Sequence, residues 1–461
     1  MLPGLKKALH HLYFNNGPLT NLLHRWRARG VGLAQQHALT RERHRQHELT
    51  LQASLREQPR PILVVFLVTE NAKWNVQSVY EALQESDAFE PLVLTFPGGH
   101  VADTPVTELV ASEASNRAFF EQRGMRVRCG YSATKGYLDL RGMAPDVVFY
   151  EQPHQFLPDS LWVREVNQFA LTCYVGYGIM VAGIQQLQFN RAFHHDMWRI
   201  FAETEQHKAL FETYSLAGSG NVEVSGHPKL DVYLDPPPAE DGTIWSVPRG
   251  AAVGGTAGGG AEVEQGTVKR VIWAPHFSIK NRGIAFSTFH RYYKYFLDLA
   301  RRDERLDWIV KPHPWLRTAC VKYGLMSAPE VEAYFHAWDD LPNARLYEEG
   351  DYFDLFKSSD AIILDSVSFV AEYMPTAKPM LFLVNREPPL VGFNEFGESL
   401  QAGLYKARSE ADIDAFIEGA LCGGEDPLAA KRQDLAGRLL VQPVGGAGVA
   451  IRDHLLNRVR Y

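Results

Sequence analysis

Two short segments combine histidine with proline in a pattern that suits chemistry on a charged ligand. They read Trp-Ala-Pro-His at 273–276 and Lys-Pro-His-Pro at 311–314, and each follows a β-branched or aromatic run. Proline fixes φ and removes a backbone donor, so the second segment is a rigid loop that can aim an imidazole. Such a histidine donates a hydrogen bond to a phosphate oxygen or acts as a general acid or base. We therefore predict functional roles for His313, His276 and Lys311, with a structural role as the alternative for each histidine.

A third polar segment follows the apolar run 362–364. Asp365, Ser366 and Ser368 stand there at the expected start of a helix. Free backbone N–H groups and the helix dipole bind phosphate at such a position, and simple helix capping is the alternative. Glu372 comes two helical turns after Asp365 and so lies roughly on the same face. Its carboxylate can accept hydrogen bonds from ribose hydroxyls, and an exposed surface glutamate is the alternative.

These segments must be positioned by strands. Three strands whose carboxyl ends all present polar groups describe one edge of an open α/β sheet, where such sheets bind ligands. The N-terminal half offers a similar edge: His154 follows the apolar run 146–150, and Glu70 and Asn71 follow the run 61–68. Adjacent His194 and His195 point apart on any regular element, so we interpret them as surface residues and predict no metal site.

The alternation of strands and helices predicts two α/β domains. At 461 residues the chain is too long for one core. We predict a helical arm at 1–58, a doubly wound domain at 59–234, a flexible linker or insertion at 235–267 and a second doubly wound domain at 268–461. The linker is rich in glycine and proline and poor in large apolar residues. Two such domains joined by a linker are expected to face a cleft, with the last helix packing back on the first domain.

The charge distribution separates the arm from the body. The net charge is −7, yet residues 1–60 hold ten Lys or Arg against three Glu, which leaves −14 for the remainder. A basic arm indicates an anionic partner, for which we expect a membrane surface and no nucleic acid. A solvated arm that packs on its own protein or on a second subunit is the alternative.

The cysteine spacing and the apolar runs of the sequence predict the cellular compartment of the protein and the redox state of its cysteines. Its four cysteines have no C-x-x-C spacing, so we predict neither a zinc site nor a disulfide framework. There is no apolar stretch of the kind a secretion signal needs and no run long enough to cross a bilayer. We therefore expect a cytoplasmic protein, peripheral on the inner face of the cell membrane through its arm.

At these residues the chain resembles the CDP-glycerol glycerophosphotransferase family of teichoic-acid and capsule polymerases. The resemblance rests on the segments 271–275, 311–314 and 360–368, on Glu372 with Lys-Pro at 378–379, and on Gly-His-Pro-Lys-Leu-Asp at 226–231. It implies a GT-B fold with two Rossmann-like domains and the nucleotide donor bound mainly to the second. It also implies transfer of glycerol phosphate, or a related polyol phosphate, from a CDP-linked donor to a glycan or lipid-linked acceptor. No cofactor is required, because the CDP-linked donor is a substrate.

The resemblance implies a role for each candidate residue. Lys311 and His313 would face the donor diphosphate. Asp365, Ser366 and Ser368 would form the phosphate-binding turn, and Glu372 would hold the ribose.

One position departs from the family pattern. Many members carry His-Gly in the first domain as the base, whereas this chain has Val-Gly-Tyr-Gly at 175–178. The base must then be His154 or His276, or the reaction differs. Two alternatives follow: a GT-B glycosyltransferase that uses a nucleotide sugar, and a non-catalytic nucleotide-binding subunit of a glycan assembly system.

Overall fold

The computed structural model describes residues 31–98, 104–236, 244–247, 267–280, 285–348, 352–385 and 391–460. The chain divides into two compact units. The first comprises the described residues up to Met180, Ile184–Leu234 and the chain from Val441, and the second comprises Val181–Gly183 and Asp235–Leu440. The predicted helices before residue 31 lie outside the described residues.

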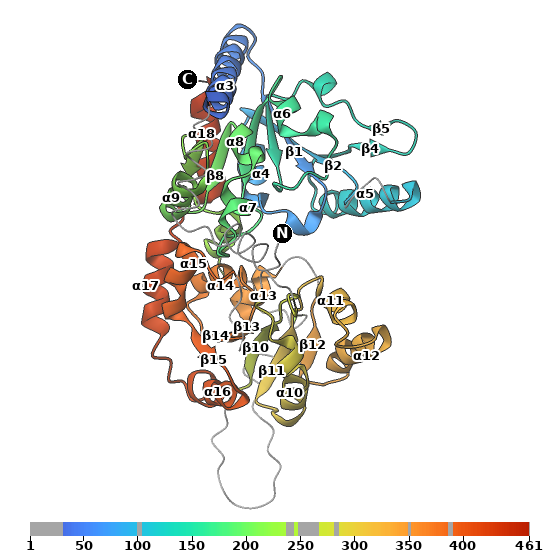
Figure 1. Ribbon diagram of the computed structural model, residues 1–461, viewed down its shortest axis with the longest axis vertical. Helices are drawn as coiled ribbons and strands as arrows, with labels where there is room; N and C mark the ends of the chain where they lie inside the picture. The colour runs from blue at the N-terminus through green and yellow to red at the C-terminus, as the bar shows by residue number, and fades with distance from the viewer. Residues whose placement is uncertain are drawn as a thin grey trace, which may run out of the picture. The chain divides into compact units, whose positions relative to one another are not determined.

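The first unit is built on a seven-stranded parallel sheet in the order β3-β2-β1-β6-β7-β8-β9. Strands β1, β2 and β8 of this sheet are labelled in Figure 1. Its strands are β1 (Ile62–Val68), β2 (Phe89–Thr95), β3 (Val127–Cys129), β6 (Val147–Tyr150), β7 (Leu171–Val175), β8 (Arg199–Ala202) and β9 (Val222–Val224). The central strands are continuous apolar runs because both faces of a parallel sheet are covered. A small hairpin of β4 (Tyr131–Ser132) and β5 (Gly136–Tyr137) lies outside this sheet.

Helices cover both faces of this sheet. One core cluster joins alternate residues of β1 to side chains of α3 (Val31–Glu57), α4 (Gln77–Gln84), α5 (Val106–Glu121) and α18 (Gly446–Arg460). On the other face Tyr150 packs against Phe193 and Trp162. The remaining helices of the unit are α6 (Val163–Val166), α7 (Gln185–Phe189), α8 (Ala192–Asp196) and α9 (Glu205–Tyr214).

Asp231 attaches the last helix to the first unit. Its carboxylate accepts hydrogen bonds from the backbone N–H groups of Ala447 and Gly448 at 2.7 and 2.8 Å. It also accepts from the Ser78 hydroxyl and the Gln442 side chain, both at 2.6 Å. A carboxylate at a helix N-terminus accepts hydrogen bonds from the free N–H groups there and interacts favourably with the helix dipole. The Gly-His-Pro-Lys-Leu-Asp segment therefore has a structural role at its aspartate.

The second unit repeats this topology on a six-stranded parallel sheet in the order β12-β11-β10-β13-β14-β15. Its strands are β10 (Lys269–Ala274), β11 (Leu306–Val310), β12 (Ala344–Leu346), β13 (Ala361–Leu364), β14 (Met380–Leu383) and β15 (Tyr405–Ala407). Strand β15 is three residues long and forms no apolar run in the sequence. The predicted α/β class with two doubly wound units is confirmed.

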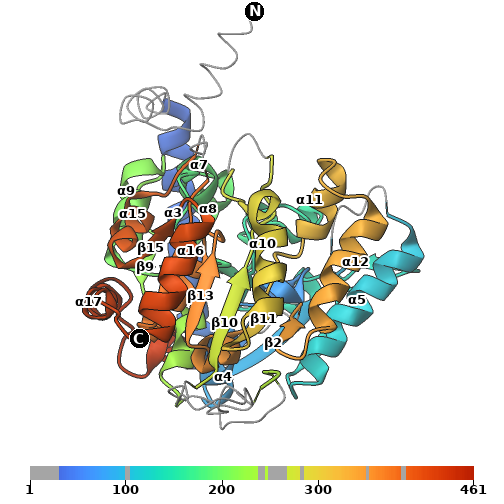
Figure 2. The same ribbon diagram turned by 90° about the horizontal axis from the view of Figure 1, so that it is seen from below.

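The helices of the second unit also form two layers. Alternate residues of β10 and β11 share a core cluster with α10 (Phe289–Arg302), α12 (Ala328–Asp339) and α16 (Glu410–Phe416), which lie over the strands in Figure 2. The other helices are α11 (Leu316–Lys322), α13 (Phe353–Ser358), α14 (Phe369–Tyr373), α15 (Glu395–Leu400) and α17 (Ala429–Leu439). No helix in the described ranges is long and apolar enough to span a membrane.

Residues 244–247 depart from the predicted flexible linker. Trp245 is buried and its indole N–H donates to the Ser358 hydroxyl at 2.9 Å. The backbone N–H of Val247 donates to Asp307 at 2.9 Å. For these four residues the prediction was wrong, because one large aromatic side chain anchors a segment that is otherwise poor in apolar residues.

Candidate functional site

The strand order gathers most of the predicted site residues at one point of the second unit. The chain moves outward from β10 to β12, then starts again at β13 on the other side of β10. Ligands bind outside the carboxyl ends of the strands at such a topological switch point. His276 lies just beyond the end of β10, Lys311 follows β11, and Asp365 follows β13.

Asp365 braces the loop that carries His276. Ala274 pairs with Leu364, so Asp365 lies one residue beyond the paired strands. One carboxylate oxygen accepts from the backbone N–H of His276 at 2.6 Å. The other accepts from the backbone N–H and the hydroxyl of Thr288, the latter at 2.8 Å. Burial raises the pKa of this carboxyl to about 6. Both oxygens are thus engaged within the chain, and Asp365 does not cap α14.

The hydrogen bonds around His276 fix its tautomer. The Ser278 hydroxyl oxygen accepts from the backbone N–H groups of Phe286 and Ser287 at 3.1 and 3.2 Å. Its own proton is left for Nδ1 of His276, 2.8 Å away. An imidazole that accepts at Nδ1 carries its proton on Nε2 when it is neutral. His276 therefore has an Nε2–H donor.

His313 has the same tautomer. Its Nδ1 accepts from the backbone N–H of Trp315 at 3.1 Å, which leaves the proton on Nε2. The His276 and His313 rings lie edge to face with their centroids 5.2 Å apart. Phe277 packs against the second ring at 4.4 Å. The two histidines that the sequence singled out therefore form one aromatic cluster.

The charges at the switch point of the second unit favour binding of an anionic group. Burial lowers the pKa of His276 to about 3. Burial and the nearby Lys311 lower that of His313 to about 4, so both rings are neutral at pH 7. Lys311 is buried, with its ammonium 5.4 Å from the Tyr347 ring centroid and 5.7 Å from that of Tyr352. A buried cation near His313, whose ring contacts His276, matches a phosphate or diphosphate.

Glu372 belongs to the same neighbourhood through Tyr352. It is buried on α14, and its carboxylate accepts from the Tyr352 hydroxyl at 2.5 Å. The alternative of an exposed surface glutamate is therefore wrong. Ser366 is buried beside Asp365, and Ser368 precedes α14 without a side-chain capping bond. Helix capping thus does not account for Ser368.

His154 lies in the first unit, in the loop after β6. Its ring centroid is 6.2 Å from that of Phe156 and 6.3 Å from that of Tyr177. Burial, then Arg191 and Lys73, lower its pKa to about 4. The order of the first sheet puts a second switch point between β1 and β6, so His154 follows one of the two strands that define it.

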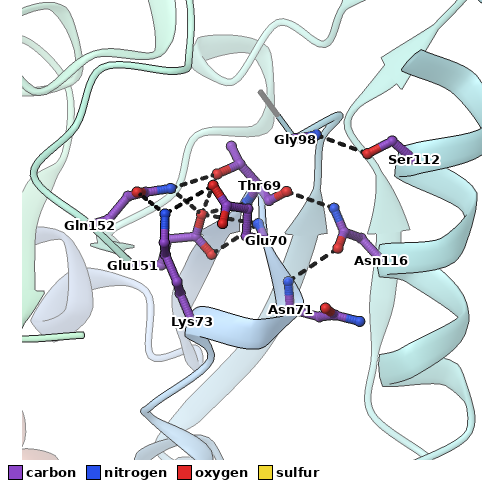
Figure 3. A network of polar contacts seen from close by, with 9 residues as sticks. All are labelled: Thr69, Glu70, Asn71, Lys73, Gly98, Ser112, Asn116, Glu151 and Gln152. Carbon is purple, nitrogen blue, oxygen red and sulfur yellow. Dashed lines mark hydrogen bonds and ion pairs between the residues drawn. The ribbon is translucent and has the colours of Figure 1, made fainter. Parts of the chain in front are cut away.

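The sequence predictions missed Glu151, which is the centre of this second switch point (Figure 3). Its Oε1 accepts from the Thr69 backbone N–H at 2.8 Å, from the Thr69 hydroxyl, and from the Gln152 amide at 3.0 Å. The Lys73 ammonium donates to Gln152 Oε1 at 2.6 Å and to Glu70 at 2.9 Å. Its position as the first residue after a buried strand was the available signal.

Helix α5 holds the loops after β1 and β2 in place (Figure 3). The Asn116 amide donates to the carbonyl oxygens of Thr69 and Phe96 at 2.7 and 3.0 Å and accepts from the N–H of Asn71 at 3.1 Å. The backbone N–H of Gly98 donates to the Ser112 hydroxyl at 3.1 Å. These bonds leave the switch point with a fixed arrangement of polar groups.

The segment 175–178, which lacks the family histidine, is fixed within the first unit at Gly176. The Gly176 carbonyl accepts from Nε2 of His227 at 2.9 Å and from the Asn75 amide. Nδ1 of His227 accepts from the backbone N–H of Lys229 at 3.1 Å. Because both nitrogens bond the chain and burial lowers its pKa to about 3, His227 is a structural residue rather than a replacement base.

The interpretation of His194 as a surface residue was wrong. It is buried, with its ring centroid 5.7 Å from those of Tyr174 and Phe211, because α8 packs against β7. Within the described ranges no group of three or more His, Cys, Asp or Glu side chains is arranged to hold a metal ion.

Comparison with known proteins identifies the fold. Neither the known protein families nor the curated sequences give a match. Among solved structures, a variant of the wall teichoic acid polymerase TagF superposes with a TM-score of 0.50 at 10% identity, over 96% of this chain and 98% of that one. The UDP-GlcNAc 2-epimerase of Neisseria meningitidis gives 0.47 at 14% identity, over 86% and 100%. MnaA of S. aureus, solved with UDP, gives 0.49 at 14% identity, over 86% and 96%.

The likeness to TagF extends over nearly the whole length of both chains. With the two Rossmann-like sheets and their repeated strand order, it shows that the chain has the GT-B fold.

Proposed function

We propose that this chain is a transferase that passes glycerol phosphate, or a related polyol phosphate, from a CDP-linked donor to a glycan or lipid-linked acceptor. The arrangement that carries the proposal is the buried Lys311 near the neutral His313, whose ring contacts the neutral His276 at the switch point of the second unit. A charge-neutral N–H donor and a cation stabilise a diphosphate in the ground state and as negative charge moves onto the leaving group. The GT-B fold shared with a teichoic acid polymerase supports the reaction class.

In this proposal each residue has a stated role. Lys311 and His313 bind the donor diphosphate, and His276 supplies a further N–H donor to the same groups. Asp365 keeps His276 in position and is held away from the phosphate by its own hydrogen bonds. Ser366 and Ser368 bind at the phosphate turn, and Glu372 accepts from the ribose hydroxyls.

The proposal extends to the acceptor and to the location of the protein in the cell. We expect a hydroxyl-bearing glycan or lipid-linked acceptor and a peripheral position at the membrane, with the basic arm as the point of contact. His154 stays a candidate for the residue that handles the acceptor proton.

Release of CMP tests the proposal. Wild-type protein incubated with CDP-glycerol and a membrane acceptor should release CMP, and His313→Ala should reduce the rate by about 100-fold or more. His336→Ala is the matched control, because that histidine is exposed on α12 of the same unit. Nucleotide binding without CMP release would contradict the proposal and favour a non-catalytic subunit. Turnover of a nucleotide sugar instead would identify a glycosyltransferase.

A further inference from the structure

Both units place a carboxylate at the same structural position. In the first unit Leu67 pairs with Tyr150, so Glu151 lies one residue beyond the paired strands and bonds the backbone N–H of Thr69. Asp365 has the same offset in the second unit, where it bonds the N–H two residues beyond the paired end of β10. Each carboxylate therefore fastens the loop after the first strand of its unit to the strand across the switch point.

The two carboxylates differ in how their oxygens are used. Asp365 is 0% exposed, and both of its oxygens accept short hydrogen bonds. Glu151 keeps 7% of its surface exposed. Its Oε1 takes the bonds from Thr69 and Gln152 and one from the Glu70 N–H at 3.2 Å. The only bond found at Oε2 among the described residues is a 3.4 Å contact from that same N–H. Fastening the loop thus engages one oxygen of Glu151 and leaves the other with acceptor capacity.

The surrounding network orients that oxygen. Lys73 donates to Gln152 Oε1, so the amide nitrogen of Gln152 must face the Thr69 hydroxyl, 2.9 Å away, and Glu151. The Thr69 hydroxyl in turn donates its single proton to Glu151. Every donor near Oε1 is fixed by a partner, so the carboxylate is held in one rotamer as a catalytic group requires.

We propose that Glu151 is the proton acceptor for the acceptor hydroxyl, which binds at the switch point of the first unit. The inference rests on the proposed transferase function and assigns the base that its chemistry needs. The ligand of this point is a polyol or sugar hydroxyl group, with Gln152 and the Glu70–Lys73 pair as further hydrogen-bonding groups around it.

The proton and electron balance of the step is simple. The O–H bond of the acceptor breaks and its proton moves to Oε2 of Glu151. The acceptor oxygen forms a bond to the phosphorus of the transferred group. The bond from that phosphorus to the bridging oxygen breaks, and its electron pair leaves with the nucleoside monophosphate. Glu151 then returns its proton to water.

The pKa values at the switch point of the first unit favour Glu151 over His154 as the general base. Burial raises the pKa of Glu151 to about 7, whereas that of His154 falls to about 4. A general base works best when its pKa lies near the working pH. Among the described residues, the charged and titratable groups of the neighbouring segments include Glu70 and Lys73 after β1 and His154 in the same loop as Glu151. Tyr177 and Arg191 adjoin His154.

The test compares Glu151→Gln with wild type in the CMP-release assay. Glutamine keeps an acceptor oxygen for Thr69 but cannot take a proton, so kcat should fall by about 100-fold or more while CDP affinity stays within about twofold. The wild-type rate should rise with pH through about 7, and this limb should be absent in the variant. Glu151→Asp, which keeps the carboxylate, should retain the limb at a reduced rate and serves if the glutamine variant does not fold.

Glu113→Gln is the matched control. Glu113 is also a buried carboxyl of the first unit, but it lies on α5 and accepts from the Thr95 hydroxyl at 2.6 Å. Its replacement should leave the pH profile unchanged. An active Glu151→Gln enzyme with the wild-type pH profile, or a loss of that limb in His154→Ala alone, overturns the assignment while the proposed function stands. A wild-type protein that releases no CMP overturns both.

Discussion

Replacing Glu151 by glutamine should remove a pH dependence from the stability of the first unit. Burial raises the pKa of this carboxyl to about 7 in the folded protein, compared with 4.5 for an exposed one. The folded state therefore binds the proton more tightly than the unfolded state. The resulting stabilisation is fully present below pH 4.5 and is lost as the pH rises through 7.

The magnitude follows from the two pKa values. Each unit of difference corresponds to about 1.4 kcal/mol, and most of the difference between 4.5 and 7 is sampled between pH 5 and 8. The wild-type free energy of unfolding should thus fall by about 2.5 kcal/mol over this interval through Glu151 alone. Glutamine carries no titrating proton, so the variant should lack this part of the decrease.

Urea unfolding at pH 5 and pH 8, followed by tryptophan fluorescence, measures the effect. The difference between wild type and variant isolates Glu151, because the buried histidines and Asp365, whose pKa is also raised, contribute equally to both proteins. The variant should become the relatively more stable protein at pH 8. Identical pH dependence in the two proteins would refute the claim that Glu151 is buried with a raised pKa.

Two further predictions concern the framework of the units. Asp231→Ala removes the acceptor of four hydrogen bonds and should destabilise the first unit by about 3 kcal/mol, with limited proteolysis showing release of α18. A variant whose α18 stays protected would contradict this role. Trp245→Ala empties a buried aromatic site and should cost the second unit about 3 kcal/mol in thermal unfolding. An unchanged melting temperature would show that residues 244–247 are a free linker.

The sequence was most informative where a candidate site residue directly follows a strand along the chain. Apolar runs that end in polar residues identified the edges of both sheets and the segments around His276, His313 and Asp365. Proline at 312 and 314 and the Asp-Ser-Val-Ser turn are local signals, so no knowledge of strand order was required to find them.

The missed features depend on contacts between distant segments. Glu151 became a candidate only when β6 was seen to lie beside β1, which brings it to Thr69 across 82 residues of sequence. The link from Asp231 to Ala447 spans 216 residues. Likewise, the apolar neighbours that bury His194 come from β7 and α9, so its own sequence surroundings gave no sign of burial.

Calorimetric titration with nucleotides measures whether the second unit binds a nucleoside diphosphate, and which one. If the switch point of the second unit binds a CDP-linked donor, wild-type protein should bind CDP more tightly than UDP, GDP or CMP. Lys311→Ala should weaken CDP binding by about tenfold or more in a variant that remains folded, because the buried ammonium supplies a charge-assisted contact to the diphosphate. Failure of the wild type to bind any nucleoside diphosphate, or equal affinity in the folded variant, would contradict the account.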